Sequence, residues 1–141
     1  CYCSLISFVM EFDNIAVLSI ILPFVGDQFG LKGEFETNAV FAMLSVVGGV
    51  GNVLQGVALM PYLKKRRKMS NLNILTLGCI FRIIGLYLLA MSVVLYDYRI
   101  AVSVVGCFVL GLGSIGRPAN IGIVSHYLHR REQGVGLGVV D

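Results

Sequence analysis

Four ionisable side chains stand inside long apolar runs of this sequence. Glu11 and Asp13 lie in the first run, Arg82 in the third and Arg117 in the fourth. An ionised group at the centre of a bilayer costs at least about 2.5–3.5 kcal/mol, so such residues persist mainly where they pair or line water. A carboxylate in that setting can bind and release a proton as its surroundings change. The four residues therefore indicate movement of a solute or an ion through a protein interior.

Asp13 and Arg117 are expected at a similar depth, because each stands a similar number of residues from the same end of the bundle. An ion pair between Arg117 and either Asp13 or Glu11 fits this depth. A structural role, in which hydrogen bonds of the acids hold the first helix in place, stays open. We interpret Arg82 as a structural partner or as a side chain that extends towards the interface.

The elements that must position these groups are apolar helices. Hydrophobic residues make up 57% of the 141 residues and charged residues only 13%, whereas soluble domains are roughly 45–50% apolar. Helices of about 20 residues cross the hydrocarbon core. The sequence therefore predicts an all-α, multi-pass membrane protein with four spans, at about residues 2–25, 38–60, 72–95 and 100–128.

A run of five consecutive cations separates the second span from the third. It begins with Lys64, Lys65, Arg66 and Arg67 and predicts a water-facing loop over residues 61–71. Short basic loops stay on the cytosolic side, so this loop, the amino terminus and residues 129–134 are expected in the cytosol. The net charge of +3 then reports topology, and we expect no nucleic-acid partner.

Small and polar residues recur at helical spacing in two spans. In the second span, with Gln55 beside them, they are Ser45, Gly49, Asn52 and Gly56. In the fourth span they are Ser103, Gly106, Leu110, Gly113, Arg117 and Asn120. Such faces let helix backbones approach closely in lipid, and the second face places Arg117 towards protein. Pro118 is expected to kink the fourth span.

The sequence predicts no metal site, no cofactor and no enzymatic activity. Cys79 and Cys107 fall inside apolar spans and Cys1 and Cys3 have no partner pair, so neither a zinc site nor a disulfide framework is expected. His126 and His129 are three residues apart on a helix but lack a third ligand.

Three segments resemble the amino-terminal part of a major facilitator superfamily transporter, in particular the drug:proton antiporter type. Residues 12–23, which end in Leu-Pro, are similar to the first-helix signature of that group. Residues 56–67 look like the signature loop that starts with Gly and ends in a basic cluster, with Met60 and Leu63 where the family has Asp and Gly. Residues 129–138 resemble the basic loop that leads into helix five.

The resemblance implies secondary active transport of a small solute by alternating access, coupled to protons or another ion. It implies a central cavity lined by helices one and four, for which the candidates are Glu11, Asp13, Asn14, Arg117 and Asn120. It also implies a cytosolic gate, for which the candidates are Gly56, Lys64, Lys65, Arg66 and Arg67. The chain begins with Cys, and residues 134–141 predict the start of a fifth span. We therefore expect a fragment whose remaining helices complete the transporter.

Two alternatives stay open. A small four-helix exporter that dimerises, resembling the small multidrug resistance type, would have about this length and an acid in its first helix. A membrane assembly or scaffold protein that does not transport would use its glycine faces to pair with partner helices.

Overall fold

The computed structural model describes residues 26–27, 29–30 and 33–127, and every regular element in these ranges is helical. The first predicted span, with Glu11, Asp13 and Asn14, lies outside the described residues. The expected loop at residues 129–134 lies outside them as well.

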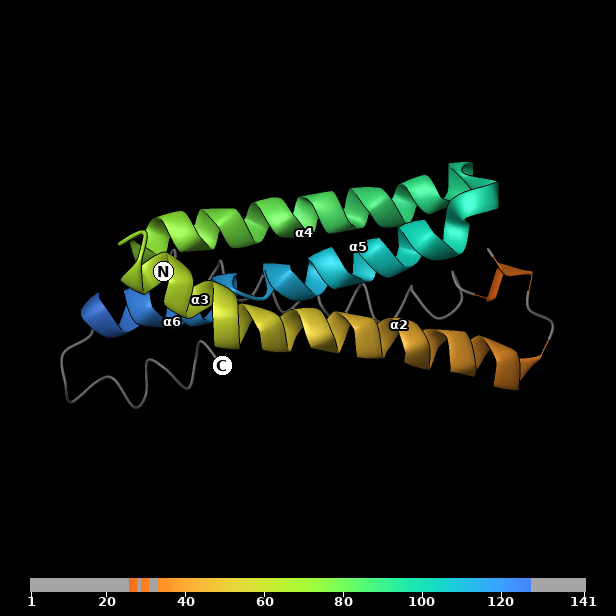
Figure 1. The fold of residues 1–141 in the computed structure, drawn as a ribbon, viewed down its shortest axis with the longest axis horizontal. Coiled ribbons are helices and arrows are strands. Elements are labelled where there is room, and N and C mark those ends of the chain that lie inside the picture. The colour runs from red at the N-terminus through yellow and green to blue at the C-terminus, as the bar shows by residue number, and fades with distance from the viewer. Residues whose placement is uncertain (1–25, 28, 31–32, 128–141) are drawn as a thin grey trace.

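Three long helical stretches make up the described part of the chain (Figure 1). The first runs through α2 (Glu34–Leu54), the π-helical turn η1 (Gln55–Leu59) and α3 (Met60–Lys65). The second is α4 (Asn71–Val94). The short 3-10 turn η2 (Tyr96–Tyr98) joins it to the third stretch, which consists of α5 (Arg99–Gly113) and α6 (Gly116–Tyr127). Each stretch is long and apolar enough to cross a membrane, so the described residues contain three candidate spans.

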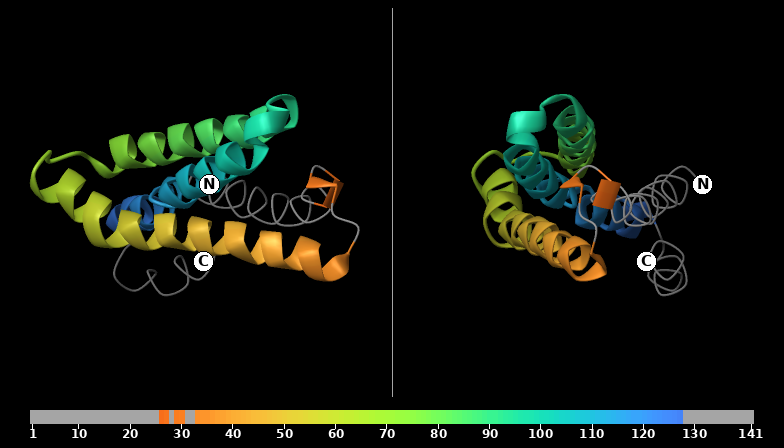
Figure 2. Two further views of the ribbon diagram at one scale, coloured as in Figure 1. Left: turned by 45° about the vertical axis from the view of Figure 1, so that its right-hand side comes forward. Right: turned by 90° about the vertical axis from the view of Figure 1, so that its right-hand side faces the viewer.

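Helix α5 lies between α2 and α4, and glycines set the distance on both sides (Figures 1 and 2). A β carbon at Gly51 of α2 would stand 2.5 Å from the carbonyl oxygen of Phe108 in α5. A β carbon at Gly85 of α4 would stand 2.9 Å from the backbone nitrogen of Leu110. Backbone therefore packs directly on backbone at both contacts, as small residues permit in lipid.

Buried apolar side chains fill the ends of this three-layer packing. One cluster joins α3, α4 and the α5–α6 junction through Leu63, Ile74, Leu75, Ile115 and Ala119. A second joins α2, α4 and α5 through Leu44, Leu89 and Cys107. Other large apolar side chains, such as Val46, Ile83 and Val94, point outwards and are exposed. Helices that are apolar on both inward and outward faces are typical of membrane spans.

The predicted loop over residues 61–71 is too long. The helix continues through Pro61 to Lys65, and α4 begins at Asn71, so the connection is only the short turn between them. In an α-helix the Pro61 ring would clash with the carbonyl of Val57. The π-helical turn that includes Val57 widens the helix there, with the Met60 N–H donating to the Gln55 carbonyl. The helix thus passes the proline, and its last turn carries Lys64 and Lys65, whose charges the helix dipole favours.

The fourth predicted span is interrupted, but the interruption does not lie at Pro118 itself. Helix α5 ends at Gly113 and α6 begins at Gly116, which places Pro118 in the first turn of α6. A proline in a continuous helix would clash with the carbonyl four residues earlier, here that of Ser114. The chain avoids this clash with tighter turns, in which Ser114 N donates to the Gly111 carbonyl (3.2 Å) and Arg117 N to the Ser114 carbonyl (3.0 Å).

The predicted packing face of the second span is wrong. Ser45, Gly49, Asn52 and Gly56 are all exposed in the structure, and a β carbon at Gly49 or Gly56 would meet nothing within 4 Å. The adjacent face, with Leu44, Gly48, Gly51 and Gln55, packs against the bundle instead. Both faces contain small residues at helical spacing, and only the one with Gly48 and Gly51 fits the backbone of α5 at Gly111.

Candidate functional site

Polar side chains are buried at several levels along the described part of the bundle. Gln55 is 8% exposed, Ser92 is 2% exposed, and Ser103 and Asn120 are each 1% exposed. They come from η1, α4, α5 and α6, and only Gln55 and Asn120 lie in the π-helical turn or close to the interruption of the fourth span. A buried polar group without a hydrogen bond costs about 1–3 kcal/mol. Interior polar groups of this kind are therefore the first candidates for contact with a solute or water.

Only one of the two polar side-chain atoms of the buried Gln55 has a hydrogen bond within the described residues. Its Nε2 donates to Asn52 Oδ1 at 3.2 Å. Its Oε1 is buried and has no hydrogen-bond partner among the described residues, and the same holds for Ser103 Oγ. The two oxygens are acceptors, and the hydroxyl of Ser103 is also a donor. Each of them, at its own level of the bundle, can hydrogen-bond to ordered water.

Arg82 lies at the middle of α4 and packs beside the interrupted helix. A β carbon at Gly113 would stand 2.7 Å from Arg82 Cγ, so the absent side chain of Gly113 makes room for the arginine stem. Arg82 is only partly exposed and its Nε is buried. It therefore packs within the bundle, which agrees with the first of the two roles considered from the sequence, that of a structural partner.

The fourth-span face is confirmed for Asn120 but not for Arg117. Ser103, Gly106, Gly113 and Asn120 are buried as expected, and Leu110 is partly buried. Arg117 is exposed, although Asn120, three residues later in α6, is buried. The acids of the proposed ion pair, Asp13 and Glu11, lie outside the described residues, so that pair stays a prediction.

The candidate gate residues lie apart from the buried polar side chains. Lys64 and Lys65 end α3, and Arg66 and Arg67 follow in the turn to α4, at one end of the bundle (Figure 1). All four side chains are exposed. Gly56 is exposed on η1. The structure thus groups the basic residues together but does not bring them to the interior site.

The described residues contain no group of three or more His, Cys, Asp or Glu that could hold a metal ion. Cys79 and Cys107 are both free thiols, the first exposed and the second buried. His126 is exposed near the end of α6, and His129 lies outside the described residues.

Comparisons of this chain with protein-family models, with curated proteins and with solved structures gave no match. The resemblance to the major facilitator superfamily therefore rests on the sequence segments alone.

Proposed function

We propose that this chain is the amino-terminal helical part of a secondary transporter, of the major facilitator type, that moves a small solute by alternating access. The observation that carries the proposal is the interruption between α5 and α6 at the level of Arg82, with Asn120 buried in the second turn of α6. Transporter sites lie near the bilayer midplane and are commonly formed by discontinuous helices. Irregular backbone at membrane depth is tolerated where protein or a water-filled cavity surrounds it.

In this proposal the first span, residues 2–25, completes the cavity. Glu11, Asp13 and Asn14 contribute from that span, Arg117 and Asn120 from α6, and Arg82 from α4. The acids carry the coupled proton. Gly56 and Lys64 to Arg67 form the cytosolic gate, and the remaining helices of a longer chain supply the rest of the site.

Water access to Asn120 tests the proposal without knowledge of the solute. We expect the variant Asn120→Cys, in intact membranes, to react with a small charged methanethiosulfonate reagent, because an alternating-access cavity admits water to that depth. The control is Ile74→Cys, at a position that is fully buried in the apolar cluster and should stay unreactive. The parent chain corrects for Cys79 and Cys107.

Two outcomes would contradict transport. Equal lack of reaction at Asn120→Cys and Ile74→Cys would show a dry, packed interior. Reaction at both would show that the bundle is not folded as described. Reaction at Asn120→Cys alone, reduced by Asp13→Asn, would connect the cavity to the acid of the first span.

A membrane assembly protein is the second candidate, because the face with Ser45, Gly49, Asn52 and Gly56 is exposed along α2 and η1. Such a face permits close pairing with a helix of another protein. If assembly is the function, Gly49→Leu with Gly56→Leu should abolish co-purification of a partner, while Asn120→Cys stays unreactive. Retained co-purification in that double variant would remove this candidate.

A further inference from the structure

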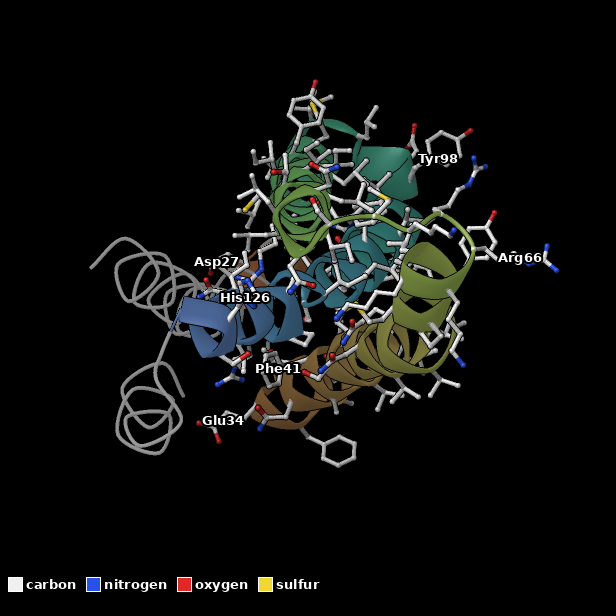
Figure 3. All side chains as sticks on the ribbon, turned by 90° about the vertical axis from the view of Figure 1, so that its left-hand side faces the viewer. Asp27, Glu34, Phe41, Arg66, Tyr98 and His126 are labelled. Atoms are coloured by element: carbon white, nitrogen blue, oxygen red, sulfur yellow. The ribbon has the colours of Figure 1, made fainter. Side chains whose placement is uncertain are left out.

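One end of the bundle carries five consecutive exposed cations, Lys64 to Lys68, which we call the basic end. Figure 3 views the molecule from this end, and the labelled Arg66 extends away from the helices. The first two cations stand on the last turn of α3 and the others on the turn that leads to α4. The basic end therefore lies where a membrane span stops and the headgroup layer begins.

The backbone holds this turn in a defined shape. Arg66 N and Arg67 N both donate to the Tyr62 carbonyl, at 2.9 and 3.3 Å. Met69 N donates to the Leu63 carbonyl at 3.1 Å, so the chain folds back over the helix end. Lys68 makes the reversal with a φ of 49°, in the left-handed region that non-glycine residues seldom occupy.

Apolar contacts fix both ends of the cationic run. Leu63, directly before it, is buried in the cluster with Ile74, Leu75, Ile115 and Ala119. Met69, directly after it, packs against the same cluster. The five charges are thus held together at the surface and cannot separate by unwinding of the turn without exposing Leu63.

The described acids lie at the opposite end of the bundle. Asp27, Glu34 and Glu36 precede or begin α2, and Asp97 lies in η2, which joins the far ends of α4 and α5 (Figure 1). Within the described ranges, no carboxylate is therefore placed to neutralise the basic end. The described part of the chain thus leaves this charge open to an anion from outside.

We propose that the basic end is a binding site for anionic phospholipid, with the lipid phosphate among Lys64 to Lys68 and the acyl chains along the exposed apolar side of the helix below. Tyr62 is 44% exposed one turn before the cations, at the height where tyrosine contacts both headgroup and acyl chain. Val57 on η1 and Leu72 on α4 add exposed apolar surface near this end. Each Lys or Arg near an anionic surface strengthens binding by about fivefold.

Tryptophan fluorescence tests this site directly, because the chain contains no Trp. The variant Tyr62→Trp places the fluorophore at the basic end, and Tyr98→Trp places a control at the opposite end, where Tyr98 is 68% exposed. Each protein is reconstituted in bilayers that mix phosphatidylcholine with brominated phosphatidylglycerol. A second set of bilayers carries the bromine on phosphatidylcholine instead. The ratio of quenching in the two sets gives the relative affinity of the two lipids at each probe.

We expect phosphatidylglycerol to be preferred over phosphatidylcholine by about fivefold or more at Tyr62→Trp and equally with it at Tyr98→Trp. In the Tyr62→Trp background, replacement of all five cations, Lys64 to Lys68, by glutamine should remove the preference. Arg66→Lys with Arg67→Lys, which keeps the charge, should retain it. Circular dichroism confirms that the variants keep their helices.

Equal quenching preference at the two probes, or a preference that survives the five glutamine substitutions, would overturn the proposal. Competition with inorganic phosphate tests whether the site binds the free anion instead of the lipid. Displacement of phosphatidylglycerol by phosphate, at an ionic strength where sodium chloride has no effect, would show a site for the free anion and would also overturn it. A loss of the preference in high salt of either kind supports lipid binding by charge.

Discussion

At the scale of single residues, the glycines of α2 divide into two functional kinds. Gly48 and Gly51 face α5 and Gly111, whereas Gly49 and Gly56 face away from the described helices. The first kind permits contact between backbones, which cannot move aside as a flexible side chain can. The second kind leaves a helix surface open.

We expect Gly51→Ala to destabilise the bundle by about 1–3 kcal/mol, because its new β carbon would overlap the Phe108 carbonyl. Gly49→Ala is the matched control, two residues away on the open face. It should leave the free energy of unfolding unchanged or raise it slightly, since alanine favours the helix. Unfolding in mixed detergent with increasing sodium dodecyl sulfate measures both variants. Equal stability of the two would contradict the packing described for α2 and α5.

The start of α4 depends on one hydroxyl. Ser70 is the N-cap, and its Oγ accepts a hydrogen bond from Asn73 N at 3.3 Å. Ser70→Ala should lower the free energy of unfolding by about 1 kcal/mol, and Ser70→Asp, which keeps an acceptor, should restore it. The same detergent unfolding measures the change. If alanine and aspartate behave alike, the cap contributes nothing to the stability of α4.

At the scale of elements, two of the helical stretches contain an irregular turn, and in both a proline follows shortly after it. The π-helical turn η1 stands directly before Pro61 in α3, and the gap between α5 and α6 stands before Pro118. In each case the carbonyl four residues before the proline lies inside the irregular turn. The outcomes differ, because a widened turn keeps the first helix continuous and a break divides the second.

We expect Pro118→Ala to join α5 and α6 more tightly. The new N–H can donate to the Ser114 carbonyl, and the clash that excluded a regular turn is gone. Amides from Ile115 to Asn120 should then exchange more slowly with deuterium, by mass spectrometry of the protein in detergent. Pro61→Ala serves as the control and should leave these amides unchanged. Unchanged exchange in Pro118→Ala would assign the break to the glycines Gly113 and Gly116 instead.

At the scale of the whole molecule, charge is distributed by end. Lys64 to Lys68 occupy one end of the bundle, and the described acids occupy the other. The positive-inside rule places the basic end in the cytosol, which is our proposed orientation. The same asymmetry underlies the proposed lipid site, but the two proposals are separate, since nanodiscs or vesicles test lipid binding in either orientation.

We expect replacement of Lys64 to Lys68 by glutamine to give a mixed orientation in the membrane, because the strongest topogenic signal of the chain is lost. Ser70→Cys, in the turn after the cations, reports the side by reaction with a membrane-impermeant maleimide on intact cells. The thiol of Ser70→Cys should be protected when the five cations are present and partly labelled when they are replaced by glutamine. When Arg99→Gln, at the other end, is combined with Ser70→Cys, the thiol should stay protected. Labelling of Ser70→Cys with all five cations in place would reverse the proposed topology.

The helical class and the presence of apolar helices long enough to cross a membrane could be predicted from sequence. Apolar runs long enough for a bilayer, interrupted by charges and turn residues, permit little else. The site could be predicted only in part. Asn120 was placed correctly on a buried face, whereas Arg117 is exposed. The contact of Arg82 with Gly113 could not be predicted, because it joins residues far apart in the chain.

The sequence by itself determined the apolar lengths, the position of the cations and the location of the prolines, since each is a local property of the chain. Only the tertiary structure decided which of two small-residue faces of α2 packs, since that choice depends on the backbone of α5 at Phe108 and Gly111. It also decided that Pro61 leaves its helix continuous while the helix before Pro118 breaks. The physical reason is that close packing depends on which backbone lies opposite a residue, and no local property of the chain contains that information.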